Sequence, residues 1–366
     1  MHGIAGARDV IASDIKLFFA TLTHVTDAYR DGGGSAPKVS EQNVCVHEEE
    51  QGLRFKFAHA ATCATFMPTT GHLAVCTQCG PLFVLQPSFG AGRDEALVDA
   101  VLSIDAFSVN FSADATYLAT TSLHGILRIY TCGAAYRLRA AFWHPTARLF
   151  AARFSPDGRS LVLASSEPTA CLLSLTEQML ASEQVYTATL DVLQSGITSL
   201  VGHTGLVPCA AFSHNGRRVV TASQDQTARL WSVAGEHRGA TLRVLRGHTA
   251  ALTHASFSPD DLWVATSSLD HTVRVYNADS GDQWAILISG SATPFNSVAW
   301  SSDGNELVTA SDDGSVQICP LSEGTLHPST TLSQHARDVW NAAFSPDRHV
   351  IASASSDSTV WVGSPR

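Results

Sequence analysis

Residues 209–231 of the chain read CAAFSHNGRRVVTASQDQTARLW, and this stretch decides the fold. An apolar run ends at Phe212 and is followed by Ser-His-Asn-Gly, residue types that favour a tight turn. A second apolar run, 219–223, leads into another polar turn that contains Asp225. The third run, 227–231, alternates in polarity and ends in a tryptophan. Short runs separated by turns in this way predict antiparallel strands.

The same pattern returns along almost the whole chain. Further copies occupy 63–85, 108–130, 151–173, 254–276, 297–319 and the segment from 341 to the C-terminus. The aromatic residue before the first turn marks the copies at Phe66, Phe111, Phe154, Phe212, Phe257, Trp300 and Phe344. The steps between these markers are 45, 43, 58, 45, 43 and 44 residues. Seven repeats with room for four short strands each predict an all-β, seven-bladed propeller.

Four positions make the pattern resemble the WD-repeat family: a Gly-His pair, a Ser, an Asp and a Trp. The matching residues in three copies are His203, Ser223, Asp225 and Trp231, then His248, Ser268 and Asp270, and finally His335, Ser355 and Asp357. The spacing from His to Asp is 22 residues in all three copies. The resemblance covers residues 51–363 and implies that these side chains form a buried structural hydrogen-bond network in each blade.

Ser, His and Asp are also the residue types of a nucleophilic triad. Because they recur at one spacing in three copies, whereas an enzyme needs one activated nucleophile, we expect no catalytic residue and no enzyme activity. The other copies depart from the pattern, with Ser291 at the His place, Cys319 at the Trp place, and His124, Glu167 and Cys79 at the Asp place.

The last copy ends at its third strand, 360–362, so its fourth strand must come from elsewhere. The segment 53–57 (LRFKF) alternates apolar and basic residues and precedes the first copy. We therefore expect this N-terminal strand to close the ring, because an unpaired strand edge is otherwise left open. The propeller domain is predicted to span 51–366.

Residues 1–50 form an N-terminal extension. A helix is expected at about 9–31, followed by a Gly-rich linker at 32–37. Apolar residues recur at the three- and four-residue spacing of a helix that packs on another helix: Ile11, Ile15, Phe18, Leu22, Val25 and Tyr29. We weigh two alternatives equally for this candidate docking helix: it packs against its own propeller, or it packs on a partner protein.

The 58-residue step marks an insertion of about 14 residues at 176–196. We expect it to project from the rim between the third and fourth blades. Its sequence permits a short helix at 177–183, and contact with a partner is one interpretation of such a loop.

Charge and composition exclude several classes of function. Charged residues make up 15% of the chain and the net charge is −10, which disfavours a bulk nucleic-acid binder. No stretch is apolar enough to insert into a membrane. Cys76 and Cys79, with Cys63 nearby, suggest zinc, but their register places them on strands and at the Asp turn. We expect no metal, no cofactor and no small-molecule substrate, and an intracellular location in the cytoplasm, with the nucleus or an organelle left open.

The resemblance implies a non-catalytic scaffold, a subunit that binds other proteins. Two positions in each blade line the partner-binding face of the family, and by register they are Leu123, Leu206, Gln224, Ala251, Leu269, Pro294, Asp312, Asp338 and Ser356. Two alternatives stay open. A locally basic cluster (Arg217, Arg218, Arg243 and Arg246) permits a structural role in an RNA–protein particle, and an N-terminal helix before seven blades is similar to G-protein beta subunits.

Overall fold

The computed structural model describes residues 44–49, 52–78, 80–86, 97–102, 105–133, 135–181, 185–190 and 196–364. The chain divides into two units, 1–43 and 44–366, and all of the described residues belong to the second unit. The predicted docking helix with its six seam residues, and the Gly-rich linker, lie outside the described residues.

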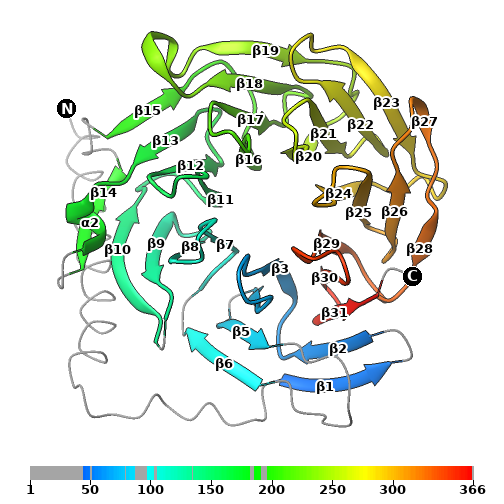
Figure 1. Cartoon of the computed structure of the whole chain (residues 1–366), viewed down its shortest axis with the longest axis horizontal. Helices are drawn as coiled ribbons and strands as arrows, with labels where there is room; N and C mark the ends of the chain where they lie inside the picture. The colour runs from blue at the N-terminus through cyan, green and yellow to red at the C-terminus, as the bar shows by residue number, and fades with distance from the viewer. Residues whose placement is uncertain are drawn as a thin grey trace, which may run out of the picture. The chain divides into compact units, whose positions relative to one another are not determined.

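Seven sheets are arranged in a ring, as Figure 1 shows, so the predicted all-β, seven-bladed propeller is confirmed. The first blade contains β3 (Ala61–Phe66), β4 (Leu73–Thr77), β5 (Leu82–Gln86) and β6 (Leu97–Leu102). The second contains β7 (Ser108–Phe111), β8 (Tyr117–Thr121), β9 (Ile126–Thr131) and β10 (Arg137–Trp143). The third contains β11 (Leu149–Phe154), β12 (Ser160–Ser165), β13 (Ala170–Ser174) and β15 (Ile197–Leu200).

The remaining blades follow in chain order. The fourth contains β16 (Cys209–Phe212), β17 (Arg218–Ala222), β18 (Ala228–Ser232) and β19 (Thr241–Leu245), with the 3-10 helix η3 (Gly235–His237) before β19. The fifth contains β20 (Leu252–Phe257), β21 (Trp263–Ser268), β22 (Thr272–Asn277) and β23 (Gln283–Ile288). The sixth contains β24 (Phe295–Trp300), β25 (Glu306–Ser311), β26 (Val316–Pro320) and β28 (Thr330–Leu332). The seventh contains β29 (Val339–Phe344), β30 (Ile351–Ser355) and β31 (Thr359–Gly363).

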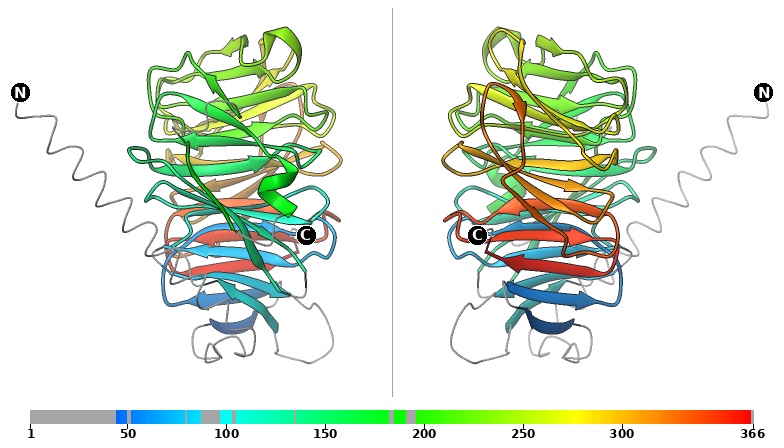
Figure 2. Two further views of the ribbon diagram at one scale, coloured as in Figure 1. Left: turned by 90° about the vertical axis from the view of Figure 1, so that its left-hand side faces the viewer. Right: turned by 90° about the vertical axis from the view of Figure 1, so that its right-hand side faces the viewer.

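Apolar side chains fill the spaces between neighbouring blades. Strands of one blade lie beside strands of the next through the thickness of the ring, as Figure 2 shows from two sides. Between the fourth and fifth blades, for example, Val220 and Leu230 are in the same buried cluster as Leu252, Phe257 and Tyr276. Each blade is therefore covered on both faces, which explains why so few charged residues are needed in this chain.

Two further strands belong to the sheet of the seventh blade. β2 (Gly52–Phe57) pairs antiparallel with β31, with Leu53 opposite Val362, and β1 (Val44–Glu49) pairs antiparallel with β2. Phe55 and Phe57 of β2 are buried in the cluster between the seventh and first blades. Their burial follows from the alternation in 53–57, which places both rings on one face of the strand.

The inserted segment takes a different place from the one expected. It leaves the third blade between β13 and β15 and carries α2 (Glu177–Ala181) and β14 (Tyr186–Thr189). β14 pairs parallel with β10, so it extends the second blade rather than projecting between the third and fourth. The reason lies in packing, because Tyr186 and the buried Met179 and Leu190 join the apolar cluster between the second and third blades.

A second added strand was not expected from the sequence. β27 (Gly324–Leu326) lies between β26 and β28 in the chain but pairs parallel with β23 of the fifth blade, with Leu287 opposite Leu326. Leu326 is buried between the fifth and sixth blades. Three of the seven sheets therefore have five strands and four have four strands.

Candidate functional site

In the fourth blade, where the sequence predicts a structural hydrogen-bond network, four buried or half-buried side chains are joined by hydrogen bonds. His203 precedes β16, and its Nδ1 lies 2.8 Å from Oδ2 of Asp225, which follows β17. Its Nε2 lies 2.7 Å from Oγ1 of Thr221, and Nε1 of Trp231 donates to the same hydroxyl at 2.8 Å. A carboxylate only accepts, so Nδ1 carries the proton, Nε2 accepts, and the Thr221 hydroxyl donates to it. Hydrogen bonds thus run from the indole through the hydroxyl and imidazole to the carboxylate.

The hydroxyl in this chain is not the one that the family resemblance implied. Ser223 Oγ donates to the carbonyl of Gly205 at 3.0 Å and accepts the N–H of Asp225 at 3.1 Å, so it holds the turn. Thr221 takes the place between imidazole and indole, two residues before Ser223 on β17. Sequence reasoning missed it, although a Thr or Ser recurs two residues before the network serine at Thr221, Thr266 and Ser353.

The fifth and seventh blades repeat the arrangement, but the residue at the Trp place differs. His248 lies 2.8 Å from both Asp270 and Thr266, while Tyr276, at the Trp place, donates to the carbonyl of Arg246 at 3.2 Å. His335 lies 2.7 Å from Ser353, 2.9 Å from Thr359 and 3.3 Å from Asp357. In this blade Gly363 stands at the Trp place and supplies no side-chain donor. The histidine and its carboxylate are therefore the constant part of the network.

The sixth blade shows what happens when the histidine is absent. Ser291 occupies the His place and donates to Asp313 at 2.5 Å. A serine side chain is too short to reach from this position to the second strand, β25, as an imidazole does. The buried hydroxyl of Thr309 on β25, which corresponds to Thr221, therefore has no hydrogen-bond partner among the described residues. In the second blade, His124 at the Asp place pairs with Asp105 at 3.1 Å on the surface.

The pKa values of two buried imidazoles, those of His203 and His248, are lowered. Burial lowers the pKa of His203 below its usual value, and Asp225 opposes this only partly. Burial alone would raise the pKa of Asp225, but the hydrogen bonds from Thr227, His203 and the Thr204 N–H lower it overall. The same causes lower the pKa of His248 and of Asp270. Lowered pKa values favour the neutral imidazole and the charged carboxylate, which agrees with the hydrogen-bond directions described above.

This geometry serves structure rather than nucleophilic chemistry. The hydroxyl that bonds His203 belongs to Thr221, which is buried, and Ser223 is buried and turned toward the backbone. A nucleophile must reach its substrate, and a general base must reach the nucleophile's proton. The arrangement instead fixes the loop that carries His203 to the turn that carries Asp225.

The nine face positions lie at one end of the blades. Leu206, Ala251, Pro294 and Asp338 precede the first strand of their blades, and Gln224, Leu269, Asp312 and Ser356 follow the second strand. Within each blade the two positions are hydrogen-bonded, since the second residue donates its N–H to the carbonyl of the first. These bonds are Gln224 to Leu206, Leu269 to Ala251, Asp312 to Pro294 and Ser356 to Asp338, at 2.9, 2.9, 3.2 and 3.0 Å. Leu123, the ninth residue, is half-buried after β8.

Exposed apolar residues stand out at this end of the ring. The side chain of Leu269 is 42% exposed and that of Trp340 is 46% exposed. Trp340 was missed by sequence reasoning because it lies inside a strand, where alternation predicts burial on one face or the other. In β29 the pairing shifts register between Val339 and Asn341, so Trp340 is the unpaired residue of a bulge and the simple alternation of the strand does not apply to it.

Two of the four arginines of the basic cluster, Arg218 and Arg243, are engaged within the chain. Arg218 forms an ion pair with Asp279 at 2.7 Å, donates to the carbonyl of Asp261 at 2.7 Å and lies over the Phe257 ring. Arg243 donates to the carbonyls of Asp279 and Leu242. These side chains are held by the protein itself, which weakens the interpretation as an RNA-binding patch.

Two of the three cysteines, Cys63 and Cys76, lie on paired strands, and Cys79 lies outside the described residues. Cys63 lies opposite Cys76 in the pairing of β3 with β4, and burial, with Cys63 beside it, raises the pKa of the Cys76 thiol. Over the residues that the structure describes, no group of three His, Cys, Asp or Glu side chains could hold a metal ion. In the same part of the chain, no helix is both long enough and apolar enough to span a membrane.

Removal of the network carboxylate tests its structural role. Asp225→Ala leaves the buried His203 without its charged partner, and we expect a loss of about 2 kcal/mol in unfolding free energy and a melting temperature several degrees lower. Asp313→Ala is the matched control, because Asp313 accepts serine and threonine hydroxyls and the Ser315 N–H at a more exposed turn and has no imidazole beside it. Thermal melting followed by circular dichroism measures both. Equal melting curves for the two variants would contradict the role assigned to Asp225.

Acid should weaken the fold through the buried histidines. Burial lowers the folded-state pKa of His203 and His248, and lowers that of His254 to about 3. The unfolded chain therefore takes up protons at higher pH than the folded chain, so stability is complete above about pH 6.5 and falls as the pH drops below it. We expect the melting temperature to decline from about pH 7 to pH 5. His254→Asn should flatten the decline and His349→Asn, at an exposed position, should not; a melting temperature that rises on acidification would refute this account.

Comparison with known proteins adds an independent line of support. The family model described as WD domain, G-beta repeat matches residues 194–232, 239–277, 284–319 and 326–362. COMPASS component SWD3 of Saccharomyces cerevisiae is 36% identical over 76 residues, which cover 21% of this chain and 23% of that protein. WD repeat-containing protein SL1-17 of Schistosoma mansoni is 38% identical over 65 residues, 18% of this chain and 21% of that protein.

A longer but weaker match is apoptotic protease-activating factor 1 of Danio rerio. It is 22% identical over 289 residues, 69% of this chain and 22% of that protein. The chain thus spans less than a quarter of the length of each of these three relatives. The four matched repeats, the ring of seven sheets and the repeated His–Asp pairs together identify the chain as a WD-repeat β-propeller protein.

Proposed function

We propose that this protein is a non-catalytic scaffold, a subunit of a multiprotein complex that binds other proteins through the end of the propeller that carries Leu269 and Trp340. The observation that carries the proposal is the exposure of these two large apolar side chains at 42% and 46%. Burial of such side chains against a partner removes apolar surface from water, and tryptophan is enriched at the centres of interfaces.

The backbone around this surface supports the proposal. Four N–H to carbonyl hydrogen bonds join the loops before the first strands to the turns after the second strands. In the fourth, fifth and seventh blades the buried His–Asp pair fixes the same loops a second time. A surface held in this way loses little conformational freedom on binding, which favours affinity.

The relatives are consistent with a subunit role. COMPASS component SWD3 is by its name part of an assembly, although the match covers 23% of that protein. Purification of the tagged full chain with mass spectrometry separates the alternatives. Stable recovery of other protein subunits supports the scaffold, RNA-processing or ribosomal proteins favour a particle component, and one obligate small helical partner favours a G-protein-beta-like subunit.

A charge placed on the apolar end should remove partners without unfolding the ring. We expect Leu269→Asp to reduce recovery of copurifying subunits at least tenfold while the melting temperature stays within about 1 °C, because surface substitutions change stability little. Leu262→Asp is the matched control. Leu262 is 50% exposed but lies in the turn before β21, whereas Leu269 follows β21, so the two leucines are at opposite ends of one strand.

The control sets the condition under which the proposal fails. If Leu269→Asp and Leu262→Asp reduce recovery equally, or if neither changes it, Leu269 is not part of the binding surface. Trp340→Ala then serves as a second variant, and retention of all partners by this variant as well would overturn the assignment.

We further propose that the N-terminal strand closes the ring and that the segment before it adds a contact with a partner. The pairing of β2 with β31 and the buried rings of Phe55 and Phe57 support the first part. The seam spacing of Ile11 to Tyr29 in the sequence supports the second.

Two truncations test these roles separately. Removal of residues 1–43 should leave the melting temperature unchanged and reduce partner recovery, whereas removal of 1–57 should lower the melting temperature by about 10 °C or more, the effect of losing several kcal/mol. Circular dichroism and size-exclusion chromatography measure the fold. An unchanged melting curve after removal of 1–57 would contradict closure, and full partner recovery after removal of 1–43 would contradict the docking role.

A further inference from the structure

The third blade keeps the network carboxylate and the serine of its turn, but it has lost the histidine, the hydroxyl that bonds the histidine and the tryptophan. Leu149 pairs with Ser165 as Leu252 pairs with Ser268, so the two blades are in the same register and Glu167 stands at the Asp place. Counting back from Leu149 places Pro145 where the histidine would be.

The other two network positions are apolar. Leu163, two residues before Ser165, replaces the threonine that bonds the imidazole in the fourth and fifth blades. Leu173 pairs with Leu161 as Trp231 pairs with Val219, so a leucine stands at the Trp place. None of these side chains can donate a hydrogen bond to Glu167.

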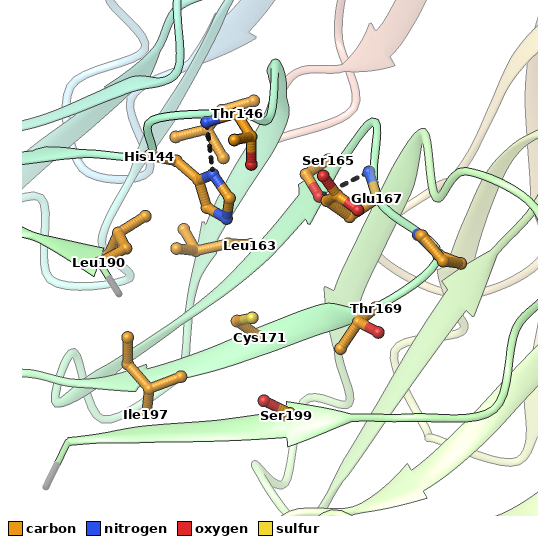
Figure 3. A pocket seen from close by; sticks show the side chains of 12 residues that line it. His144, Thr146, Leu163, Ser165, Glu167, Thr169, Cys171, Leu190, Ile197 and Ser199 are labelled. Atoms are coloured by element: carbon orange, nitrogen blue, oxygen red, sulfur yellow. Dashed lines mark hydrogen bonds between the residues drawn. The ribbon is translucent and has the colours of Figure 1, made fainter. Parts of the chain in front are cut away.

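A cavity lies where the missing side chains would be. Its volume is about 620 Å³, and Figure 3 shows its lining from close by. Ser165, Glu167 and Thr169 lie at one side of the view, and Leu190 and Ile197 lie at the other. Leu163 and Cys171 lie between the two groups and complete the wall. The cavity is thus acidic at one end and apolar along its length.

The Glu167 carboxylate has no cation beside it among the described residues. In that part of the chain, no Lys, Arg or His forms an ion pair with it. Its backbone N–H is bonded to Ser165 Oγ at 3.2 Å. By contrast, the equivalent Asp225, Asp270 and Asp357 each face a histidine ring at 3.3 Å or less.

His144 does not take over the missing imidazole's role. Its Nδ1 accepts the backbone N–H groups of Ala147 at 3.0 Å and Thr146 at 3.4 Å, so its own loop fixes the ring. In Figure 3 the ring lies across the cavity from Glu167. His144 is therefore part of the wall.

We propose that this cavity binds a long cationic side chain, arginine or lysine, of a partner protein. Its methylene groups would lie along Leu163, Leu190 and Ile197, and its charged end would reach Glu167 and the hydroxyls of Ser165 and Thr169. Basic side chains combine an apolar stem with a charged tip, which matches a cavity that is apolar along its length and acidic at one end. The proposal rests on the proposed scaffold function only in that the side chain belongs to a partner.

The test uses small probes and the full chain. N-acetyl-arginine methylamide, N-acetyl-lysine methylamide and the neutral N-acetyl-citrulline methylamide are titrated while the amide signals of the protein are followed by NMR. We expect the cationic probes to bind at least tenfold more tightly than citrulline and to shift signals of 163–171 and 197–199. The ratio between arginine and lysine identifies the preferred cation.

Two variants and one control make the result specific. Glu167→Gln should weaken binding of the cationic probes at least tenfold, and Cys171→Phe should block the cavity with the fold intact. Glu177→Gln, an exposed acid on α2, should bind like the unmodified chain. Equal binding of citrulline, or unchanged binding to Glu167→Gln, would overturn the proposal.

The probe experiment is independent of the scaffold proposal. Binding of the probes with no recovered partner would leave the cavity assignment intact and count against the scaffold. Recovery of partner proteins without binding of the probes would support the scaffold and overturn the cavity assignment.

Discussion

Each sheet in this protein has apolar side chains on both faces, and neither face can be left in water. The rest of the structure depends on this constraint, because a blade becomes stable only when a neighbour covers each of its faces. Seven buried clusters, each formed between two adjacent blades, meet that requirement. The stability of the ring is therefore distributed over seven similar contacts. Substitution at any one contact affects two blades at once.

Within this frame the polar network has a limited and specific task. Apolar packing is non-directional, so it does not determine where the loops at the ends of the strands lie. The buried pair of His203 and Asp225, and its counterparts in the fifth and seventh blades, supply direction by joining a loop to a turn. The blades that lack the pair use other means, a serine in the sixth and a surface pair in the second. The loop end of the ring is consequently held firmly where Leu269 lies.

The features that recur in every blade were predicted from the sequence, whereas features found in a single blade were not. The seven aromatic markers predicted seven blades, and the pairs such as Leu269 with Ala251 lie together because register alone places them. Thr221 was missed because a threonine in a strand has no signature until its partner is known. Trp340 was missed because it lies at a shift in pairing, where the alternation of a regular strand does not predict which side chains are exposed. The added strands β14 and β27 were missed because each pairs in parallel with a strand that is not adjacent in the chain, so no short turn sequence marks the pairing.

Those added strands change the circumference of the ring. β1, β14 and β27 cover the outer edges of the seventh, second and fifth blades. Among the residues described, the outermost strand is β1, β14 or β27 in these three blades and β6, β15, β19 or β28 in the other four, and the outer backbone N–H and C=O groups of each outermost strand have no partner strand. An extended segment of another protein can extend a sheet by pairing with such an edge. The ring is therefore one strand wider at three of its seven blades, and strand addition at those blades would pair with β1, β14 or β27 rather than with a regular fourth strand.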